Sequence, residues 1–241
     1  MRAILFDLDG TLLDLDLQAF LRNYFSALEC ATRAALGPES GGDAFMRALR
    51  TATSQMMIPH LGQTNRSVFF AEMLRMTGIN LDAKWAVFDA FYSETFPGLG
   101  GQTRPARGAR EAVETALALG LRVAVATNPI FPREAIDHRL TWAGLSDLPF
   151  DVITSFEFME SCKPHAAYFA QTASLLGVHP SECMMVGDDP LLDMPAADIG
   201  MRTFYVGPEP CTSATLHGDL TVLAELLPRL VAPQAESDWL R

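Results

Sequence analysis

The chain has 241 residues, of which 49% are apolar and 20% are charged, and its formal net charge at pH 7 is −11. This length is enough for one large hydrophobic core, or for a core domain with a smaller second domain. An acidic chain without a basic stretch is poorly suited to nucleic acid or to an anionic membrane, so we expect neither as a partner.

Targeting signals are not evident in the sequence. The N-terminal segment lacks the apolar region of a signal peptide, and no apolar run is long enough to span a membrane. The cysteines are scattered without a Cys-x-x-Cys pair, which is typical of reduced thiols. We therefore expect a cytoplasmic protein. Its oligomeric state, monomer or homodimer, stays open.

The first predicted element is a buried β-strand over residues 2–6, followed directly by the sequence DLDGT at residues 7–11. Alternate side chains of an extended segment point the same way, so Asp7 and Asp9 are expected to converge where this strand ends. Gly10 permits a sharp turn that brings backbone N–H groups toward whatever the carboxylates hold. Two carboxylates this close need a cation or a shared proton to coexist.

The next segment, about 17–96, carries stripes of apolar residues at helical spacing and no strand pattern, which predicts a small helical bundle. The stripes run over residues 17–28, 45–56, 68–76 and 85–96. The glycine-rich segment 97–101 then predicts a flexible junction.

From residue 105 onward, helical and strand patterns alternate, which favours a parallel sheet with helices on both faces. Helices are predicted over residues 105–119, 133–142, 166–176 and 222–230. Strands are predicted at 122–126, 151–153, 183–186 and 203–206. Residues 232–241 are expected to fray.

The order of these elements predicts an α/β fold, with a Rossmann-like, three-layer parallel sheet as the core and an inserted α-helical cap domain. The core domain is predicted to comprise residues 1–14 and 100–241, and the cap domain residues 15–99. In open α/β sheets, ligands bind beyond the carboxyl ends of the strands. Polar residues at these ends are therefore the candidates for a functional site.

Such residues follow four strands or strand-like segments. They are Asp7 and Asp9, then Thr127 and Asn128, then Lys163, and finally Asp188, Asp189 and Asp193. Lys163 is notable because the chain contains only one other lysine, Lys84.

This set of groups suits phosphoryl transfer through an aspartyl-phosphate. A carboxylate that attacks a phosphate dianion faces repulsion of about 4 kcal/mol per pair of unit charges at roughly 4 Å, for an effective dielectric constant near 20. A divalent cation offsets this repulsion, and oxygen ligands favour Mg²⁺. We predict that Asp188, with Asp189 or Asp193, supplies such oxygens, and that Lys163 adds a positive charge beside the phosphate.

Taken in order, these residues resemble the four motifs of the haloacid dehalogenase superfamily. The matching segments are DLDGT at 7–11, Thr127-Asn128, Lys163-Pro164, and Gly187-Asp188-Asp189 through Asp193. The resemblance covers nearly the whole chain and includes a helical insertion similar to the family's C1 cap. It is strongest to the branch of phosphoglycolate-phosphatase-like proteins.

The resemblance implies a role for each motif. Asp7 would be the nucleophile and Asp9 the general acid/base, and Thr127 and Lys163 would complete the catalytic residues. The implied phosphate-binding residues are Leu8, Gly10, Thr11, Thr127, Asn128 and Lys163. The implied Mg²⁺ ligands are Asp7, Asp9 through its backbone carbonyl, Asp188, Asp189 and Asp193.

The expected activity is hydrolysis of a small phosphorylated metabolite, a phosphomonoester, with Mg²⁺ as cofactor. A 2-haloacid dehalogenase and a phosphosugar mutase of the same superfamily stay open as alternatives, as does a non-catalytic binding relative. Asp9 disfavours the dehalogenase, because cleavage of a carbon–halogen bond needs no proton donor. Thr11 fits the phosphatase pattern better than that of the mutases, and a non-catalytic relative would be expected to lose a motif.

Three further residues invite a functional interpretation. His60 and Arg66 lie in a predicted cap loop and are candidates to contact the substrate, although the simpler expectation is that they do not. Cys162 adjoins Lys163, and a nearby ammonium lowers the pKa of a thiol. We expect Cys162 to be a small buried side chain and not a redox switch.

Overall fold

The fold was analysed in a computed structural model that describes residues 1–36 and 42–232. The fraying expected for the C-terminal tail falls, from residue 233 on, outside the described residues. The core is a six-stranded sheet in the order β5-β4-β1-β6-β7-β8, in which all neighbouring strands are parallel. The strands are β1 (Ala3–Phe6), β4 (Arg122–Val125), β5 (Val152–Ile153), β6 (Cys183–Gly187), β7 (Arg202–Tyr205) and β8 (Leu216–His217).

The register of the sheet aligns the ends of the three central strands. Phe6 of β1 lies opposite Val125 of β4 on one side and Val186 of β6 on the other. The residues that follow these strands therefore leave the sheet at one edge. The predicted site residues at positions 7, 127 and 188 all emerge there.

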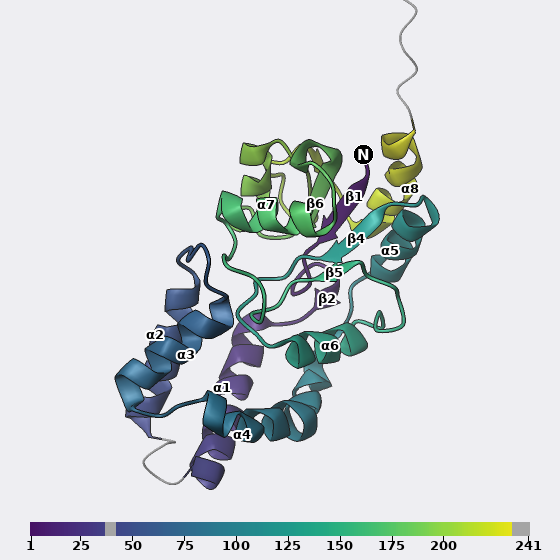
Figure 1. The fold of residues 1–241 in the computed structure, drawn as a ribbon. Coiled ribbons are helices and arrows are strands. Elements are labelled where there is room, and N and C mark those ends of the chain that lie inside the picture. Colours follow the sequence, from purple (N-terminus) through teal and green to yellow (C-terminus); the bar gives the residue numbers. More distant parts are fainter. Residues whose placement is uncertain (37–41, 233–241) are drawn as a thin grey trace, which may run out of the picture.

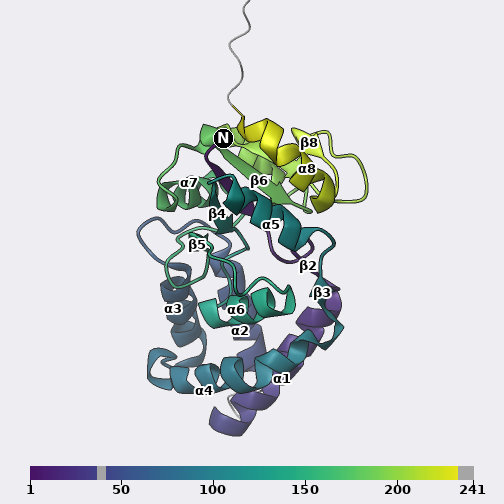
Figure 2. The ribbon, with the colours of Figure 1, turned by 90° about the vertical axis from the view of Figure 1, so that its right-hand side faces the viewer.

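Helices cover both faces of the sheet, as the sequence predicted (Figures 1 and 2). Ile4 and Phe6 of β1 belong to a hydrophobic cluster shared with α5 (Ala109–Ala118) and α8 (Leu220–Val231). Ala3 and Leu5 belong to a second cluster that includes residues of α7 (Ala166–Leu175) and η6 (Met194–Ile199). This alternation of side chains along a buried strand makes the core a three-layer α/β structure.

The helices between β1 and α5 lie below the sheet in Figure 1. They are α1 (Leu17–Leu36), α2 (Asp43–Met56), α3 (Asn65–Thr77), η2 (Asp82–Lys84), α4 (Trp85–Ala90), the π-helical η3 (Phe91–Thr95) and the 3₁₀-helical η4 (Phe96–Gln102). The remaining helical elements are α6 (Arg133–Trp142) and the 3₁₀ turn η5 (Pro180–Glu182). No helix within the described ranges is long and apolar enough to cross a membrane.

The end of the helical insertion differs from the prediction. Residues 85–96 were expected to form one helix and 97–101 a flexible junction, but the helix changes type twice and continues as η4. The rings of Phe96 and Trp142 stack with centroids 5.4 Å apart. A Cβ atom on Gly100 would clash with the Trp142 indole, so the glycine provides close packing here and not flexibility.

The chain passes from the core to the insertion and back through two short segments, and these segments pair with each other. β2 (Leu13–Asp14) and β3 (Arg104–Pro105) form a two-stranded antiparallel sheet, and Arg104 Nε donates to Asp14 Oδ2 at 2.7 Å. These short strands, like β8, had no counterpart in the sequence prediction, because each pairs a polar residue or proline with its neighbour and lacks the apolar pair that marked β5. The domain limits placed near residues 14 and 100 stay a prediction.

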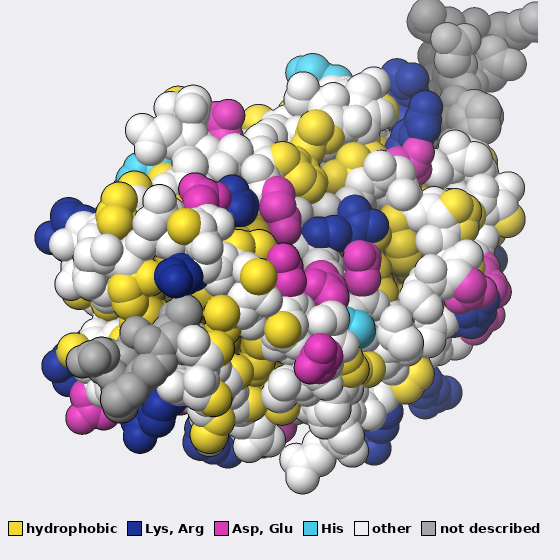
Figure 3. All heavy atoms as spheres, turned by 60° about the horizontal axis from the view of Figure 1, so that its bottom comes forward, with side chains coloured by type: hydrophobic (Ala, Val, Ile, Leu, Met, Phe, Trp, Pro, Cys, Tyr) yellow, Lys and Arg dark blue, Asp and Glu magenta, His cyan; other side chains and the backbone are white. Residues whose placement is uncertain are grey.

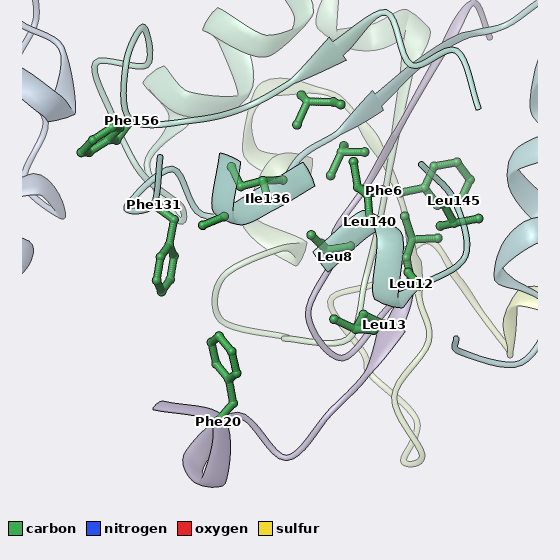
Figure 4. Packing of buried hydrophobic residues seen from close by; sticks show 14 of the residues in the cluster. Phe6, Leu8, Leu12, Leu13, Phe20, Phe131, Ile136, Leu140, Leu145 and Phe156 are labelled. Carbon is green, nitrogen blue, oxygen red and sulfur yellow. The ribbon is translucent and has the colours of Figure 1, made fainter. Parts of the chain in front are cut away.

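The insertion packs continuously onto the core. Figure 4 shows Phe20 of α1 and Phe131 of the loop after β4 pointing toward one another, to the left of Leu8 in this view. All three side chains are buried and belong to the same hydrophobic cluster as the central strand. The cluster therefore joins the underside of the sheet edge to α1.

Candidate active site

The loop after β1 carries Asp7 out of the sheet and then turns back on itself. Gly10 adopts a φ of 90°, which favours glycine, and its N–H donates to the Leu13 carbonyl at 2.8 Å. The N–H of Thr11 donates to the Leu8 carbonyl at 3.3 Å. Both amides are thus engaged within the loop in this structure, and the phosphate contacts that the resemblance implies for Gly10 and Thr11 stay a prediction.

Lys163 lies between two carboxylates. Its Nζ donates to Asp7 Oδ1 and to Asp193 Oδ1, in each case at 2.6 Å, and only 2% of the lysine is exposed. Burial lowers the pKa of Lys163, but Asp193 and Asp7 outweigh this effect, so the pKa is raised and the ammonium stays charged. The structure therefore brings the predicted lysine onto the predicted nucleophile.

The loop after β6 supplies two more carboxylates to the same place. Asp188 accepts from Thr11 Oγ1 at 3.0 Å, and its pKa is raised to about 6 by burial and by the charge of Asp7. Asp193 is 1% exposed, and burial raises its pKa against the opposing charge of Lys163. A Cβ atom at Gly187 would clash with the Asp193 carboxylate, so glycine is needed for this close approach.

Asp189 plays a different part in the loop. Its Oδ1 accepts from the N–H of Leu191 at 2.8 Å and from that of Leu192 at 3.0 Å, whereas its own N–H donates to Asp193 Oδ2 at 3.1 Å. The side chain thus caps the local turn and holds the loop against Asp193. It lines the cavity without belonging to the carboxylate cluster of Asp7, Asp188 and Asp193.

The residues after β4 border the same cavity. Thr127 is 3% exposed, and its carbonyl accepts from Thr154 Oγ1 at 2.7 Å and from the Tyr168 hydroxyl at 3.0 Å. Asn128 Oδ1 accepts from the N–H of Lys163 at 3.1 Å. Asn128 therefore positions the backbone of the lysine in this structure, in addition to lining the cavity.

The carboxylates that meet here fit a divalent cation. One oxygen from each of Asp7, Asp188 and Asp193 lies within 4.8 Å of the others. These three groups carry three negative charges when ionised. The one positive charge of Lys163, which contacts Asp7 and Asp193, leaves two of them to be balanced. A hard cation with oxygen ligands suits this donor set, and Mg²⁺ is such an ion. Asp7, Asp188 and Asp193 are the residues that would hold it.

Asp9 lies beside this cluster and pairs with a residue that sequence reasoning missed. Arg139 Nη1 of α6 donates to Asp9 Oδ2. Burial raises the pKa of Asp9, the charge of Arg139 opposes this shift, and the charge of Asp7 adds to it. A signal for Arg139 existed in the sequence, because the arginine occupies the buried stripe of α6 beside Ile136 and Leu140.

These residues line a cavity of about 210 Å³. Leu17 and Leu21 of α1 close it from the side of the helical insertion, and Ile130 and Phe131 form a wall. Three of these residues, Leu21, Ile130 and Phe131, also line a neighbouring apolar cavity of about 50 Å³. The site thus has a charged floor and apolar walls.

The first residue of α3 docks the insertion onto the core. Asn65 is fully buried, and its Nδ2 donates to the Pro129 carbonyl at 2.9 Å and to Cys162 Sγ at 3.3 Å. His60 Nε2 pairs with the Gln55 carbonyl, and Arg66 pairs with Asp82. Neither His60 nor Arg66 lines the cavity, as the simpler expectation had it. Cys162 is buried, also as expected.

Comparison with known proteins supports a family assignment. A family model described as haloacid dehalogenase-like hydrolase matches residues 1–198. Protein SUPPRESSOR OF QUENCHING 1, chloroplastic, of Arabidopsis thaliana is 31% identical over 77% of this chain, which corresponds to 16% of that protein. Pyrophosphatase PpaX of Halalkalibacterium halodurans is 31% identical over 43% of this chain and 46% of its own length. The chain thus spans less than half the length of these curated relatives.

Solved structures share the fold. A HAD phosphatase from Thermococcus onnurineus aligns with a TM-score of 0.56 and 19% identity, over 95% of this chain and 98% of its own. A structure described as a predicted phosphoglycolate phosphatase from Haemophilus somnus 129pt aligns with a TM-score of 0.53 and 19% identity, over 94% of this chain and 97% of its own. At these identities the likeness concerns the fold alone.

Proposed function

Because the chain belongs to the haloacid dehalogenase-like hydrolases, we propose that it is a Mg²⁺-dependent phosphatase that hydrolyses a small phosphomonoester through an aspartyl-phosphate. The observation that carries this proposal is the contact of Lys163 with Asp7, beside the carboxylates of Asp188 and Asp193. A nucleophilic carboxylate, a fixed ammonium and a site for a divalent cation are what an attack on a phosphate dianion requires. The names of a related pyrophosphatase and of a structurally similar phosphatase support the same reaction class.

The first step is attack by the free carboxylate oxygen of Asp7 on the phosphorus atom. The P–O bond to the leaving group breaks, its electron pair goes to the leaving oxygen, and Asp9 supplies the proton that makes this oxygen an alcohol. In the second step, Asp9 takes a proton from water as the water oxygen attacks phosphorus. The bond between phosphorus and Asp7 then breaks, which releases inorganic phosphate and restores both aspartates.

Other groups hold the reactants in place. Lys163 fixes Asp7 and balances part of the charge, and Thr127 and Asn128 border the space that the phosphate would occupy. Bound Mg²⁺ would supply charge neutralisation between the two anionic reactants. Ordering these groups before the reaction lowers the cost of orientation in the transition state.

The size and lining of the cavity support a small substrate. Its volume of about 210 Å³ lies below the roughly 300 Å³ at which pockets for drug-sized ligands begin. On the face drawn in Figure 3, lysine and arginine side chains are scattered among acidic and apolar ones. A small phosphorylated metabolite stays the predicted partner, and the cytoplasmic location and a monomeric or dimeric state stay predictions.

The proposal is tested with a panel of phosphomonoesters, assayed with Mg²⁺ and with EDTA. Asp7→Asn should abolish turnover, because an amide is not a nucleophile of this kind, whereas the exposed Asp198→Asn serves as a matched control and should retain full activity. Rapid acid quenching should trap a phosphoenzyme that hydroxylamine cleaves. Hydrolysis that survives both EDTA and Asp7→Asn would refute the mechanism.

A further inference from the structure

The guanidinium of Arg139 is an unusual group to find inside this molecule. The residue is 1% exposed, its Nε donates to the Ala135 carbonyl at 3.2 Å, and its Cζ lies 4.5 Å from the centre of the Phe131 ring. The ammonium of Lys163 serves two carboxylates, whereas Arg139 contacts a single one, that of Asp9. Arg139 also lines the cavity of the candidate site.

Helix packing alone does not account for a charge at this position. Replacing a buried ion pair by apolar residues of similar volume is often neutral or stabilising, so stability gives little reason to bury one. The neighbours of Arg139 on the buried stripe of α6 are Ala135, Ile136 and Leu140, which shows that an apolar side chain suits the stripe. A role of the Arg139–Asp9 pair in the candidate active site is therefore the better explanation for burying it.

The pairing distinguishes the two oxygens of Asp9. Oδ2 accepts from Arg139 Nη1, whereas Oδ1 is buried and has no hydrogen-bond partner among the described residues. Nη2 of Arg139 is likewise buried and without such a partner in the described ranges. A carboxylate held through one oxygen has a fixed torsion, and its other oxygen keeps a defined position.

We propose that Arg139 is a positioning residue, which anchors Asp9 through Oδ2 so that Oδ1 is presented to the leaving-group oxygen and to the attacking water. This inference rests on the proposed function, because it assigns Arg139 a task in the proton transfers made by Asp9. A proton donor must lie within hydrogen-bond reach of the atom that it serves, and a misplaced donor loses much of its effect. The Phe131 ring over the guanidinium and the Ala135 carbonyl hold the arginine itself in place.

The test compares two substrates that differ in their need for a proton donor. p-Nitrophenyl phosphate releases a stable phenolate, whereas benzyl phosphate releases an alkoxide unless the oxygen is protonated. Arg139→Gln should lower kcat/KM for benzyl phosphate by on the order of 10²-fold, with a much smaller loss for p-nitrophenyl phosphate. Arg139→Lys should recover part of this loss. Arg133→Gln is the matched control, since Arg133 lies on the same helix but is exposed and pairs with Asp137.

Asp9→Asn separates this inference from the proposed function. This variant should also lower kcat/KM much more for benzyl phosphate than for p-nitrophenyl phosphate. In the double variant with Arg139→Gln, the difference between the two substrates should be no larger than in Asp9→Asn alone. If Asp9→Asn lowers kcat/KM, which reports the step that releases the alcohol, equally for both substrates, the role of Asp9 as general acid in the proposed function fails. The inference is overturned if Asp9→Asn shows the unequal loss but Arg139→Gln lowers kcat/KM equally for both substrates, or for neither. Arg139 would then have a merely structural role.

A variant that does not fold need not end the test. Should Arg139→Gln fail to fold, Arg139→Lys carries the same comparison, because lysine keeps the charge but cannot reproduce the planar guanidinium contact. The asymmetric loss is then expected for Arg139→Lys, and unchanged kinetics on both substrates would overturn the inference.

Discussion

Nζ of Lys163 lies 2.6 Å from Oδ1 of Asp7, although 156 residues separate them in the chain. The contact exists because β1 is central in the sheet and the loop that carries Lys163 returns to the end of this strand. It joins the first and the third sequence motif in one ion pair. Asp193, from the fourth motif, completes the arrangement on the other side of the ammonium.

Replacing Lys163 should therefore destabilise the fold strongly. Lys163→Met leaves the carboxylates of Asp7 and Asp193 buried without their cation, and breaking a buried pair in this way typically costs 3–5 kcal/mol in the free energy of unfolding, so we expect a loss of about 4 kcal/mol. Urea denaturation measures this loss. Lys84→Met is the matched control, since Lys84 is exposed and its loss should be within about 0.5 kcal/mol of zero.

Addition of Mg²⁺ should restore part of the stability lost in Lys163→Met, because a cation held by the same carboxylates would offset their repulsion. Denaturation curves with and without Mg²⁺ report this recovery. A Lys163→Met protein as stable as the native one, in EDTA, would show that the ion pair contributes nothing to the fold.

Asp188 and Asp189 are adjacent in sequence but should respond differently to substitution. The Asp188 carboxylate belongs to the cluster with Asp7 and Asp193, so Asp188→Asn should weaken Mg²⁺ binding about tenfold or more. The Asp189 carboxylate caps the N–H groups of Leu191 and Leu192, so Asp189→Ala should cost about 1 kcal/mol of stability with little change in Mg²⁺ affinity. Calorimetric titration with Mg²⁺ and urea denaturation separate the two effects, and equal affinities for both variants would contradict the assignment.

Asn65 should control how firmly the helical insertion docks on the core. Asn65→Ala removes the donor to the Pro129 carbonyl and leaves this buried acceptor unsatisfied, which costs about 1–3 kcal/mol. We expect faster cleavage by protease and higher amide exchange at the start of α3. Asn80→Ala is the control, because Asn80 is exposed and its Oδ1 accepts from the nearby N–H groups of Asp82 and Ala83, within the insertion. Equal protection in the two variants would show that the docking does not depend on Asn65.

The cysteines should differ in their reaction with thiol reagents. Burial raises the pKa of Cys162 to about 12 and that of Cys183 to about 11, so each stays a thiol well above neutral pH. Hydrogen bonding from Ser213 lowers the pKa of Cys211, which is partly exposed, and Cys30 is exposed. At pH 8 a disulfide reagent should modify Cys211 and Cys30 first, and mass spectrometry identifies the sites. Rapid labelling of Cys162 in the folded protein would revive a redox role for it.

Much of the core fold could be predicted from the sequence. The alternating helices and strands gave an α/β class because each strand is buried on both faces and therefore reads as an apolar run. The short strands β2 and β3 escaped prediction because they contain charged residues or proline and no apolar run, unlike the equally short β5. The end of the insertion was also wrong, since the packing of Gly100 against Trp142 is a tertiary effect.

The candidate site was also predicted only in part. Residues that follow long apolar strands, such as Asp7 and Asp188, could be located because the edge of a parallel sheet gathers them. Arg139 was not predicted because it lies in the interior of a helix, whereas the candidate residues were chosen from the ends of strands. The different tasks of Asp188 and Asp189 depend on the direction of each side chain in one turn, and sequence spacing carries no information about that direction.

The pairing of Leu13–Asp14 with Arg104–Pro105 has a consequence for the history of the molecule. Since the chain leaves and re-enters the sheet at neighbouring points, the helices between them can be exchanged, lengthened or shortened without altering the strand order. Selection can thus alter what is admitted to the cavity while the machinery at the strand ends stays unchanged. A chimaera that joins a relative's helices to this core at these two strands should retain the sheet intact.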